Sequence, residues 1–346
     1  MDTIQIKLSV FDGGDLTNNE IDNLKNFINY IKSPNGYNYC DFLDIRKEGD
    51  IAIKISYPRY FKNSNVFLIR DNTQVLEVNE HFCRKLSDHH LLKNSYIYLE
   101  RIDIPFTYYK NEKHNFHSYL NIFMMLGEVY NKRKANGIQK AYSDLLTKKY
   151  ETITYADSKT KSSYNSKVTV YNQYENIKTK TADEDELKYY LDQFGDLKDR
   201  IRIESSKRIR RKYFSNKEFS KFDILSEYLD SAKKEIFTNL LNFEIIDEVY
   251  EEKKELLIKS LKEEKALGNF NYEVAFLKYN GYVHDYEVLR RAFKIFIEND
   301  KTRESAITKM RKILNDYSER ENIIIIDVYS KLKEIKNSID SFYTIK

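Results

Sequence analysis

Short stretches of alternating apolar and polar residues occur through the first 206 residues, the pattern of strands that bury one face. Between them, apolar residues at helical spacing predict helices. The predicted strands cover residues 2–10, 50–56, 65–70, 95–107, 151–155, 167–174 and 199–206. The predicted helices cover residues 17–31, 73–87, 115–130 and a short stretch that begins at 183–186. This mixed order predicts an α+β fold, with an antiparallel sheet backed by helices.

The pattern changes near residue 215, where alternation gives way to helical spacing alone. Further helices are predicted at residues 222–240, 243–266, 271–278, 285–298, 302–317 and 323–338. No linker rich in Pro or Gly separates the two parts. We therefore expect a first domain over residues 1–215 and an all-helical region over 216–346 that packs on it or continues from it.

Composition narrows the class of protein. A net charge of +4 is small, so any basic patch must be local. The chain has no apolar run of about 18 residues and no leader pattern. We therefore expect neither a transmembrane nor a secreted protein. Cys40 and Cys83 form no CxxC motif, which favours a reducing cytoplasm over a disulfide frame or a zinc-cysteine site. No phosphate-binding loop motif is present, so chemistry driven by ATP is not expected.

Tyr171 is the candidate nucleophile. Strand alternation places it on one face with Lys167 and Thr169, and places Val168 and Val170 on the other face. A tyrosine hydroxyl ionises near pH 10, so attack on a phosphodiester needs a cation or metal nearby. The chain has 29 tyrosines, and a tyrosine that only packs on the sheet is the alternative.

Asp103 and Glu204 are the candidate metal ligands. They lie on separate predicted strands, and each follows an arginine two residues earlier, Arg101 and Arg202. Two carboxylates side by side could hold Mg²⁺ or Mn²⁺ through hard oxygen ligands and so neutralise charge that develops on a phosphate. The alternative is a pair of surface carboxylates in salt bridges.

Residues 207–212 contain five cations in six positions. A cluster this dense is typical of contacts to a phosphate backbone, although a solvated helix face is an alternative. Tyr213 and Phe214 follow directly and could stack on bases. The residues expected to contact DNA are Lys167, Arg101, Arg200, Arg202, Lys207, Arg208, Arg210 and Arg211.

Four blocks, in the same order, resemble the replication initiators of filamentous phages, the gene II nickase family. Rolling-circle plasmid initiators show a looser likeness. The blocks are the strand at residues 1–7, the segment 57–65, Arg101-Ile102-Asp103, and a tyrosine strand at 168–175 followed by Arg-x-Glu strand residues 200–204. The resemblance covers about residues 1–215 and implies a rolling-circle endonuclease-like domain.

The resemblance implies a nick in one DNA strand, a 5′-phosphotyrosine link and a free 3′-OH that primes synthesis. Tyr171 matches the nucleophile, and Asp103 and Glu204 match acidic positions suited to the metal. Gln173 stands where the family often has lysine, so Lys167 or Lys178 would have to supply the missing cation. Otherwise the nucleophile is a neighbouring tyrosine, Tyr164 or Tyr174.

We therefore expect a rolling-circle replication initiator, a metal-dependent tyrosine endonuclease in the cytoplasm of a bacterium or of a phage's bacterial host. Its partners would be origin DNA, a host helicase and a DNA polymerase. The helical region would recognise origin duplex or recruit the helicase. The alternatives are a non-catalytic origin-binding regulator, a mobilisation relaxase of the same chemistry, and a structural or partner-binding protein.

Overall fold

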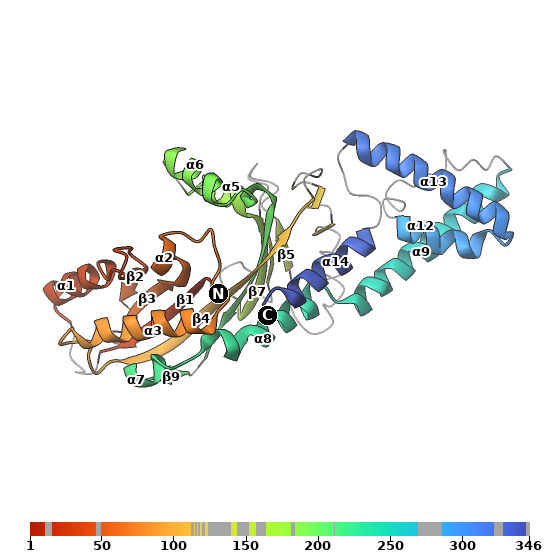
Figure 1. The fold of residues 1–346 in the computed structure, drawn as a ribbon. Helices are drawn as coiled ribbons and strands as arrows, with labels where there is room; N and C mark the ends of the chain where they lie inside the picture. The colour runs from red at the N-terminus through yellow and green to blue at the C-terminus, as the bar shows by residue number, and fades with distance from the viewer. Residues whose placement is uncertain are drawn as a thin grey trace. The chain divides into compact units, whose positions relative to one another are not determined.

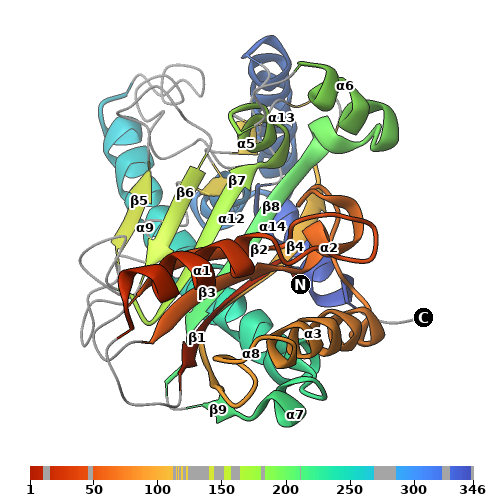
Figure 2. The ribbon, with the colours of Figure 1, turned by 90° about the vertical axis from the view of Figure 1, so that its left-hand side faces the viewer.

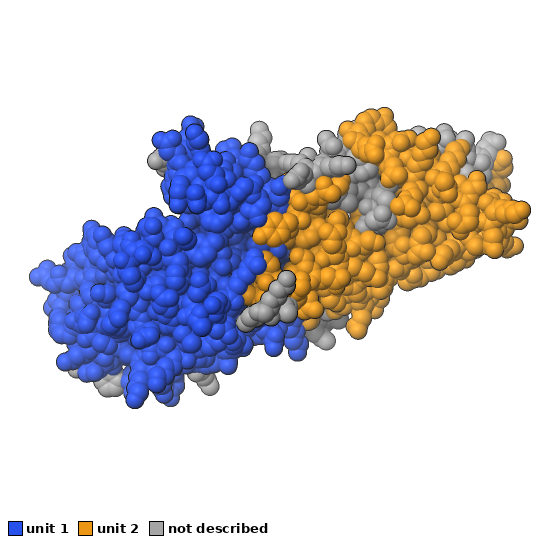
Figure 3. Space-filling model, viewed as in Figure 1, with its two compact units in different colours: residues 1–107, 142–236, 345 blue, residues 108–141, 237–344, 346 orange. Residues whose placement is uncertain are grey.

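A computed structural model gives the structure of the chain. It describes residues 1–10, 16–45, 50–111, 114, 116, 118–119, 122–123, 140–143, 152–156, 164–180, 184–210, 212–268, 286–321 and 328–343. The chain divides into two compact units (Figure 3). Unit 1 comprises residues 1–107 and 142–236, and unit 2 comprises residues 108–141 and 237–344.

A nine-stranded sheet organises unit 1, in the order β2-β3-β1-β4-β8-β7-β6-β5, with the short β9 also pairing with β4. Pairs β1–β3, β1–β4, β2–β3, β4–β9, β6–β7 and β7–β8 are antiparallel. Figure 2 shows β6, β7 and β8 side by side. The strands are β1 (Thr3–Ser9), β2 (Cys40–Ile45), β3 (Ile51–Ser56), β4 (Tyr96–Tyr109), β5 (Lys140–Ser143), β6 (Thr152–Ala156), β7 (Ser166–Asn172), β8 (Arg200–Arg208) and β9 (Tyr213–Phe214). The α+β class and the antiparallel sheet are thus confirmed.

The two faces of the sheet differ in chemistry. One face is apolar and buried, with Ile4, Ile102, Val170 and Ile203 among its members. Helix α8 (Ile224–Asn239) packs on this face, where its Ala232 lines a small cavity with side chains of β4 and β8. The opposite face carries the charged and tyrosine side chains of the same strands, because successive residues of a strand point to opposite faces.

A bulge in β4 changes this alternation at one point. Gln5 of β1 pairs with Arg101, whereas the next residue, Ile6, pairs with Leu99, so Glu100 is an extra residue on β4. The bulge therefore places Arg101 on one side of it and Tyr98 on the other side on the same polar face.

Helices of unit 1 lie around the sheet (Figure 1). Helices α5 and α6 lie at the end of the sheet where β7 ends and β8 begins (Figures 1 and 2). Helix α1 starts with a capping box, in which Thr17 accepts from the Glu20 amide and Glu20 accepts from the Thr17 amide. Besides α8, the helices are α1 (Asn18–Asn29), α2 (Tyr57–Lys62), α3 (Asn72–Ser87), α5 (Gln173–Lys178), α6 (Glu184–Gln193), the 3₁₀ turn Leu197–Asp199 and α7 (Asn216–Phe219).

The predicted strand at residues 65–70 is wrong, since this segment is an irregular crossing loop. Val66 and Ile69 are fully buried, which explains the strand-like apolar pattern. Their backbone carbonyls bond outside any ladder: Val66 accepts from the side chains of Gln173 and Arg200, and Ile69 accepts from the amino group of Met1. Two side chains and the N-terminal amino group thus replace the neighbouring strand that the segment would have needed.

Unit 2 contains helices α9 (Phe243–Ala266), α12 (Tyr286–Phe296), α13 (Asp300–Glu321) and α14 (Val328–Ser341). The predicted C-terminal helices at these places are confirmed, and the predicted helix at 271–278 lies outside the described residues. The units divide after Ile236, not at residue 215, because α8 begins by packing on the sheet of unit 1. Across the residues described, no helix has the length and apolar character needed to cross a bilayer.

Candidate functional site

The polar face of β4, β8 and β7 carries the predicted nucleophile, Tyr171, and the two predicted metal ligands, Asp103 and Glu204. In the β7–β8 ladder Tyr171 pairs with Arg202 and Thr169 pairs with Glu204. Asp103 of β4, the strand beside β8, lies opposite Thr3 of β1. Sequence alternation predicted the face of Tyr171, and the strand order brings the three residues into one neighbourhood.

Tyr171 and Glu204 are in direct contact. The tyrosine hydroxyl donates to Glu204 Oε2 at 3.4 Å. Burial raises the pKa of Tyr171 well above 10, and the Glu204 charge adds to this shift. Burial, followed by repulsion from Asp103 and Asp2, raises the pKa of Glu204 to about 7. The hydroxyl is therefore protonated at neutral pH and has a proton acceptor within reach.

Asp2 is a third carboxylate at this site, which the sequence did not reveal. Burial raises its pKa, and the Asp103 charge raises it further, while Arg202 opposes the shift. Asp2 and Asp103 are 9% and 5% exposed, and each has a buried Oδ1 atom without a hydrogen-bond partner. In the sequence, the only sign of a role for Asp2 is its position at the start of a predicted strand. In the structure, the next residue, Thr3, pairs with Asp103.

The carboxylates fit a hard divalent cation in their donor chemistry. Two buried carboxylate oxygens lack a donor, and repulsion among Asp2, Asp103 and Glu204 would be relieved by a cation. Within the described ranges, no three His, Cys, Asp or Glu side chains are already arranged as a metal site. A bound cation would therefore have to draw these carboxylates closer together.

Arginines supply the positive charge at this centre. Arg101 donates to Asp103 Oδ2 at 2.9 Å. Arg202 is 2% exposed, and its buried Nε and Nη1 atoms have no hydrogen-bond partner. The prediction that Arg202 contacts a DNA backbone is therefore not compatible with its burial, and its charge acts instead on Asp2 and Tyr171.

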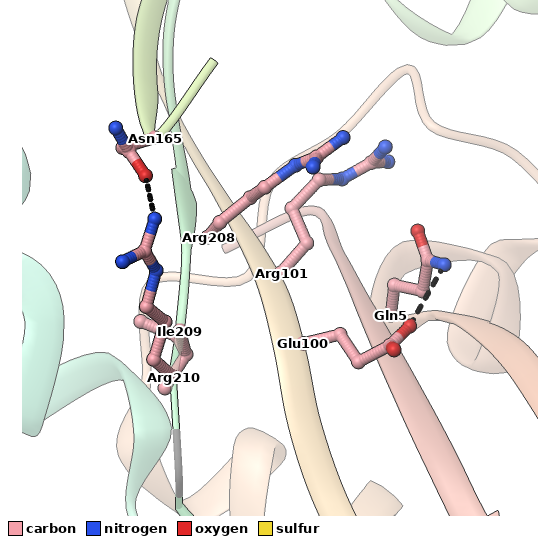
Figure 4. A pocket seen from close by; sticks show the side chains of 7 residues that line it. All are labelled: Gln5, Glu100, Arg101, Asn165, Arg208, Ile209 and Arg210. Carbon is pink, nitrogen blue, oxygen red and sulfur yellow. Dashed lines mark hydrogen bonds between the residues drawn. The ribbon is translucent and has the colours of Figure 1, made fainter. Parts of the chain in front are cut away.

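An arginine pocket of about 300 Å³ adjoins the carboxylate centre through Arg101. Arg101 and Arg208 extend in the same direction over it (Figure 4), while Arg210 donates to Asn165 at 2.6 Å on one side. We use the name arginine pocket for the site lined by Gln5, Glu100, Arg101, Asn165, Arg208, Ile209 and Arg210. Clustered guanidinium groups at a partly open pocket suit a phosphate group.

The remaining predicted DNA contacts have other partners. Arg200 donates to the Val66 carbonyl and to Asp196, so it ties the crossing loop to β8. Lys207 lies on the α8 side of the sheet, where it donates to Ser231 at 2.7 Å. Lys167 stays on the polar face, and its charge lowers the pKa of Glu204. Arg211 lies outside the described residues.

Gln173 has a structural role that explains a neutral residue at this position. It is 2% exposed, and its amide donates to the carbonyls of Asn65 and Val66. The other two candidate tyrosines are also held by neighbours. The ring of Tyr164 contacts the cations of Lys167 and Arg208, and Lys198 lies over the ring of Tyr174. Of the three, only Tyr171 has its hydroxyl bonded to a carboxylate of the centre.

Comparison with family models, with curated proteins and with solved structures finds no match to this chain.

Proposed function

We propose that this protein is a rolling-circle replication initiator that nicks one DNA strand through Tyr171. One observation carries the proposal: the Tyr171 hydroxyl contacts Glu204 on the same sheet face that presents Asp103 and the arginine pocket. A nucleophile, a proton acceptor, anionic ligands for a cation and a cationic phosphate site are the parts that phosphoryl transfer to tyrosine requires.

In the proposed reaction, Tyr171 Oη attacks the phosphorus and its proton passes to Glu204. The bond from phosphorus to the 3′ oxygen breaks, and that oxygen takes a proton from water. The products are a 5′-phosphotyrosine and a 3′-OH primer. Asp103 and Glu204, with Asp2 close by, would hold Mg²⁺ or Mn²⁺, which when bound neutralises charge on the reacting phosphate. Arg101, Arg208 and Arg210 would hold a neighbouring phosphate.

The setting of this activity follows from the same proposal. The chain has no phosphate-binding loop motif, so a host helicase would have to unwind the origin and a host polymerase would extend the primer. The protein would work in the cytoplasm of a bacterium. A mobilisation relaxase would share the chemistry and differ only in the DNA that it processes.

A non-catalytic DNA-binding regulator is the second candidate. The observation that favours it is the raised pKa of Tyr171, because a phenol that resists ionisation is a weaker nucleophile. In that case the same basic face would bind origin DNA and the tyrosines would only stack on bases.

The test is a covalent adduct that survives SDS. The protein is incubated with labelled single-stranded candidate origin DNA and Mn²⁺, and adducts are resolved on denaturing gels and mapped by peptide analysis. We expect an adduct on Tyr171, its loss in Tyr171→Phe with DNA binding retained, and a weaker metal response in Asp103→Ala. Tyr174→Phe serves as the matched control. Undiminished nicking by Tyr171→Phe would contradict the assignment of Tyr171 as the nucleophile. Tight DNA binding without any adduct would favour the regulator.

A further inference from the structure

Three tyrosines form a cluster on the polar face of the sheet, beyond the arginine pocket. The ring of Tyr213 lies 5.7 Å from that of Tyr98 and 6.2 Å from that of Tyr96. Tyr213 is 62% exposed and Tyr96 is 37% exposed, so large aromatic surfaces face solvent. We call Tyr96, Tyr98 and Tyr213 the tyrosine cluster. Aromatic rings that face solvent contribute little to the core. Their clustering from two strands therefore indicates a surface that binds a partner.

The tyrosine cluster and the arginine pocket share one face because of the bulge at Glu100. Gln5 pairs with Arg101 and Lys7 pairs with Tyr98, so both pairs lie on the same side of the β1–β4 ladder. If β4 alternated regularly through Glu100, Tyr98, which lies three residues before Arg101, would point to the face opposite Arg101.

The segment after β8 extends this surface along β4. The Ile209 amide donates to the Glu100 carbonyl at 2.8 Å, and the Leu99 amide donates to the Lys212 carbonyl at 3.0 Å. Arg208 and Arg210 are thereby placed beside Glu100, and Tyr213 is placed beside Tyr98.

The distances along the strands suit a flexible chain of nucleotides. From Glu204 to Arg208 the polar face of β8 advances four residues, or about 13 Å. Guanidinium groups come first along this path and tyrosine rings follow. Lys7 adds a cation 4.8 Å from the centre of the Tyr98 ring. Alternating positive charge and open aromatic faces are the means by which proteins hold single-stranded nucleic acid without reading its sequence.

We infer that the arginine pocket and the tyrosine cluster form a track that binds single-stranded DNA next to the phosphate attacked by Tyr171. This inference rests on the proposed nicking function. The track takes the DNA that flanks the cleaved bond: its backbone enters the arginine pocket, and unpaired bases stack on Tyr98 and Tyr213. Base-paired DNA is a poor ligand for these rings, because its bases already stack on one another.

The test measures binding apart from chemistry. The full-length protein carrying Tyr171→Phe is titrated, in EDTA, against fluorescein-labelled dT20, and anisotropy gives the Kd. We expect Tyr98→Leu and Tyr213→Leu each to raise the Kd by roughly fivefold or more. Tyr213→Phe keeps the ring and should stay within roughly twofold. Arg208→Gln should reduce the salt dependence of binding, whereas the tyrosine variants should not.

Two exposed tyrosines away from the sheet provide matched controls. Tyr30 follows α1 and Tyr189 lies on α6, and they are 70% and 58% exposed. Tyr30→Leu and Tyr189→Leu should leave the Kd unchanged. Equal affinities for the cluster and control variants would overturn the track, and so would a hairpin duplex that competes as well as dT20.

The same variants separate the track from the nicking reaction. Normal dT20 binding by the cluster variants, together with a Tyr171 adduct in the wild type, would remove the track and keep the proposed function. Weakened dT20 binding by the cluster variants, with no adduct in the wild type, would keep the track and remove the nicking function.

Discussion

At the scale of single residues, several ionisable side chains around Tyr171 are buried together, out of contact with most of the solvent. Asp2, Asp103, Glu204 and Arg202 interact through a medium of low polarity, so each ionisation depends on the others. The pKa of Tyr171 is raised, not lowered, so in the proposed reaction the Tyr171 phenol would have to lose its proton during attack. Its hydrogen bond to Glu204 provides that route.

The raised pKa of Glu204 makes stability depend on pH. In the unfolded chain this carboxyl titrates near 4.5, and in the folded protein near 7. Between these values the folded state binds more protons, so the free energy of unfolding falls as pH rises, and the loss is complete above pH 7. A shift of this size corresponds to about 3 kcal/mol. Glu204→Gln should remove this dependence in EDTA and stabilise the protein at pH 8 relative to the wild type.

Urea denaturation at pH 4.5, 6 and 8 measures this effect. Glu184→Gln, which changes an exposed glutamate on α6, is the matched control and should follow the wild type. A Glu204→Gln variant with the pH dependence of the wild type would show that another group is responsible.

At the scale of elements, the crossing loop at residues 65–70 is held by side chains. Gln173 and Arg200 come from α5 and β8, at the end of the sheet where the Tyr171 strand finishes. Gln173 therefore couples the end of β7, the strand of Tyr171, to the loop. A lysine at this position would place a charge where only 2% of the side chain reaches solvent, at a cost in desolvation.

Loss of these side-chain donors should loosen the loop. Gln173→Ala removes the side-chain donor of the Asn65 carbonyl, and a group left buried and unpaired costs about 1 to 3 kcal/mol. Gln173→Ala and Arg200→Ala each remove one of the two donors of the Val66 carbonyl. We expect faster hydrogen exchange at the Ile69 amide, which bonds to the Met1 carbonyl. Arg59→Ala is the control, since Arg59 bonds to Asp41 and to the Asn38 carbonyl instead. Unchanged exchange in both loop variants would mean that apolar burial alone holds the segment.

The sequence predicted most elements of the sheet, because their alternation reflects a buried and a polar face. The β6–β7 hairpin, β8 and β4 were found in this way. Alternation did not predict the backbone conformation correctly where tertiary contacts determine it, as at residues 65–70 and at the short strand β2. For the site, alternation predicted the face of Tyr171. The burial of Arg202 and the presence of Asp2 depend on strand order, which alternation does not encode.

At the scale of the whole molecule, the chain divides into a sheet unit and a helical unit with separate means of stabilisation. In unit 2, Arg291 of α12 forms ion pairs with Asp247, Glu251 and Glu287. It also lies over the ring of Tyr329 of α14. One guanidinium group therefore joins three helices of this unit.

Arg291→Met should destabilise unit 2 by about 2 kcal/mol, because three carboxylates lose their common partner. Thermal melting followed by circular dichroism should show the helical signal lost at a lower temperature. Binding of dT20 at 20 °C should remain at the wild-type level, since the proposed track lies in unit 1. Arg303→Met, which removes one pair with the exposed Asp300, is the control and should have little effect. Equal melting of both variants would contradict the role given to Arg291.

The single extra residue in β4 shifts the alternation of side chains between the two faces of the sheet by one position. On each side of Glu100 the strand keeps a regular two-residue period, but the two periods are out of phase. Loss of Glu100 alone would make β4 a regular strand with the same two faces, because Tyr98 would then lie two residues from Arg101. A strand of unchanged length that lost the bulge would instead turn Tyr96 and Tyr98 toward the interior and bring Ile97 and Leu99 to the polar face.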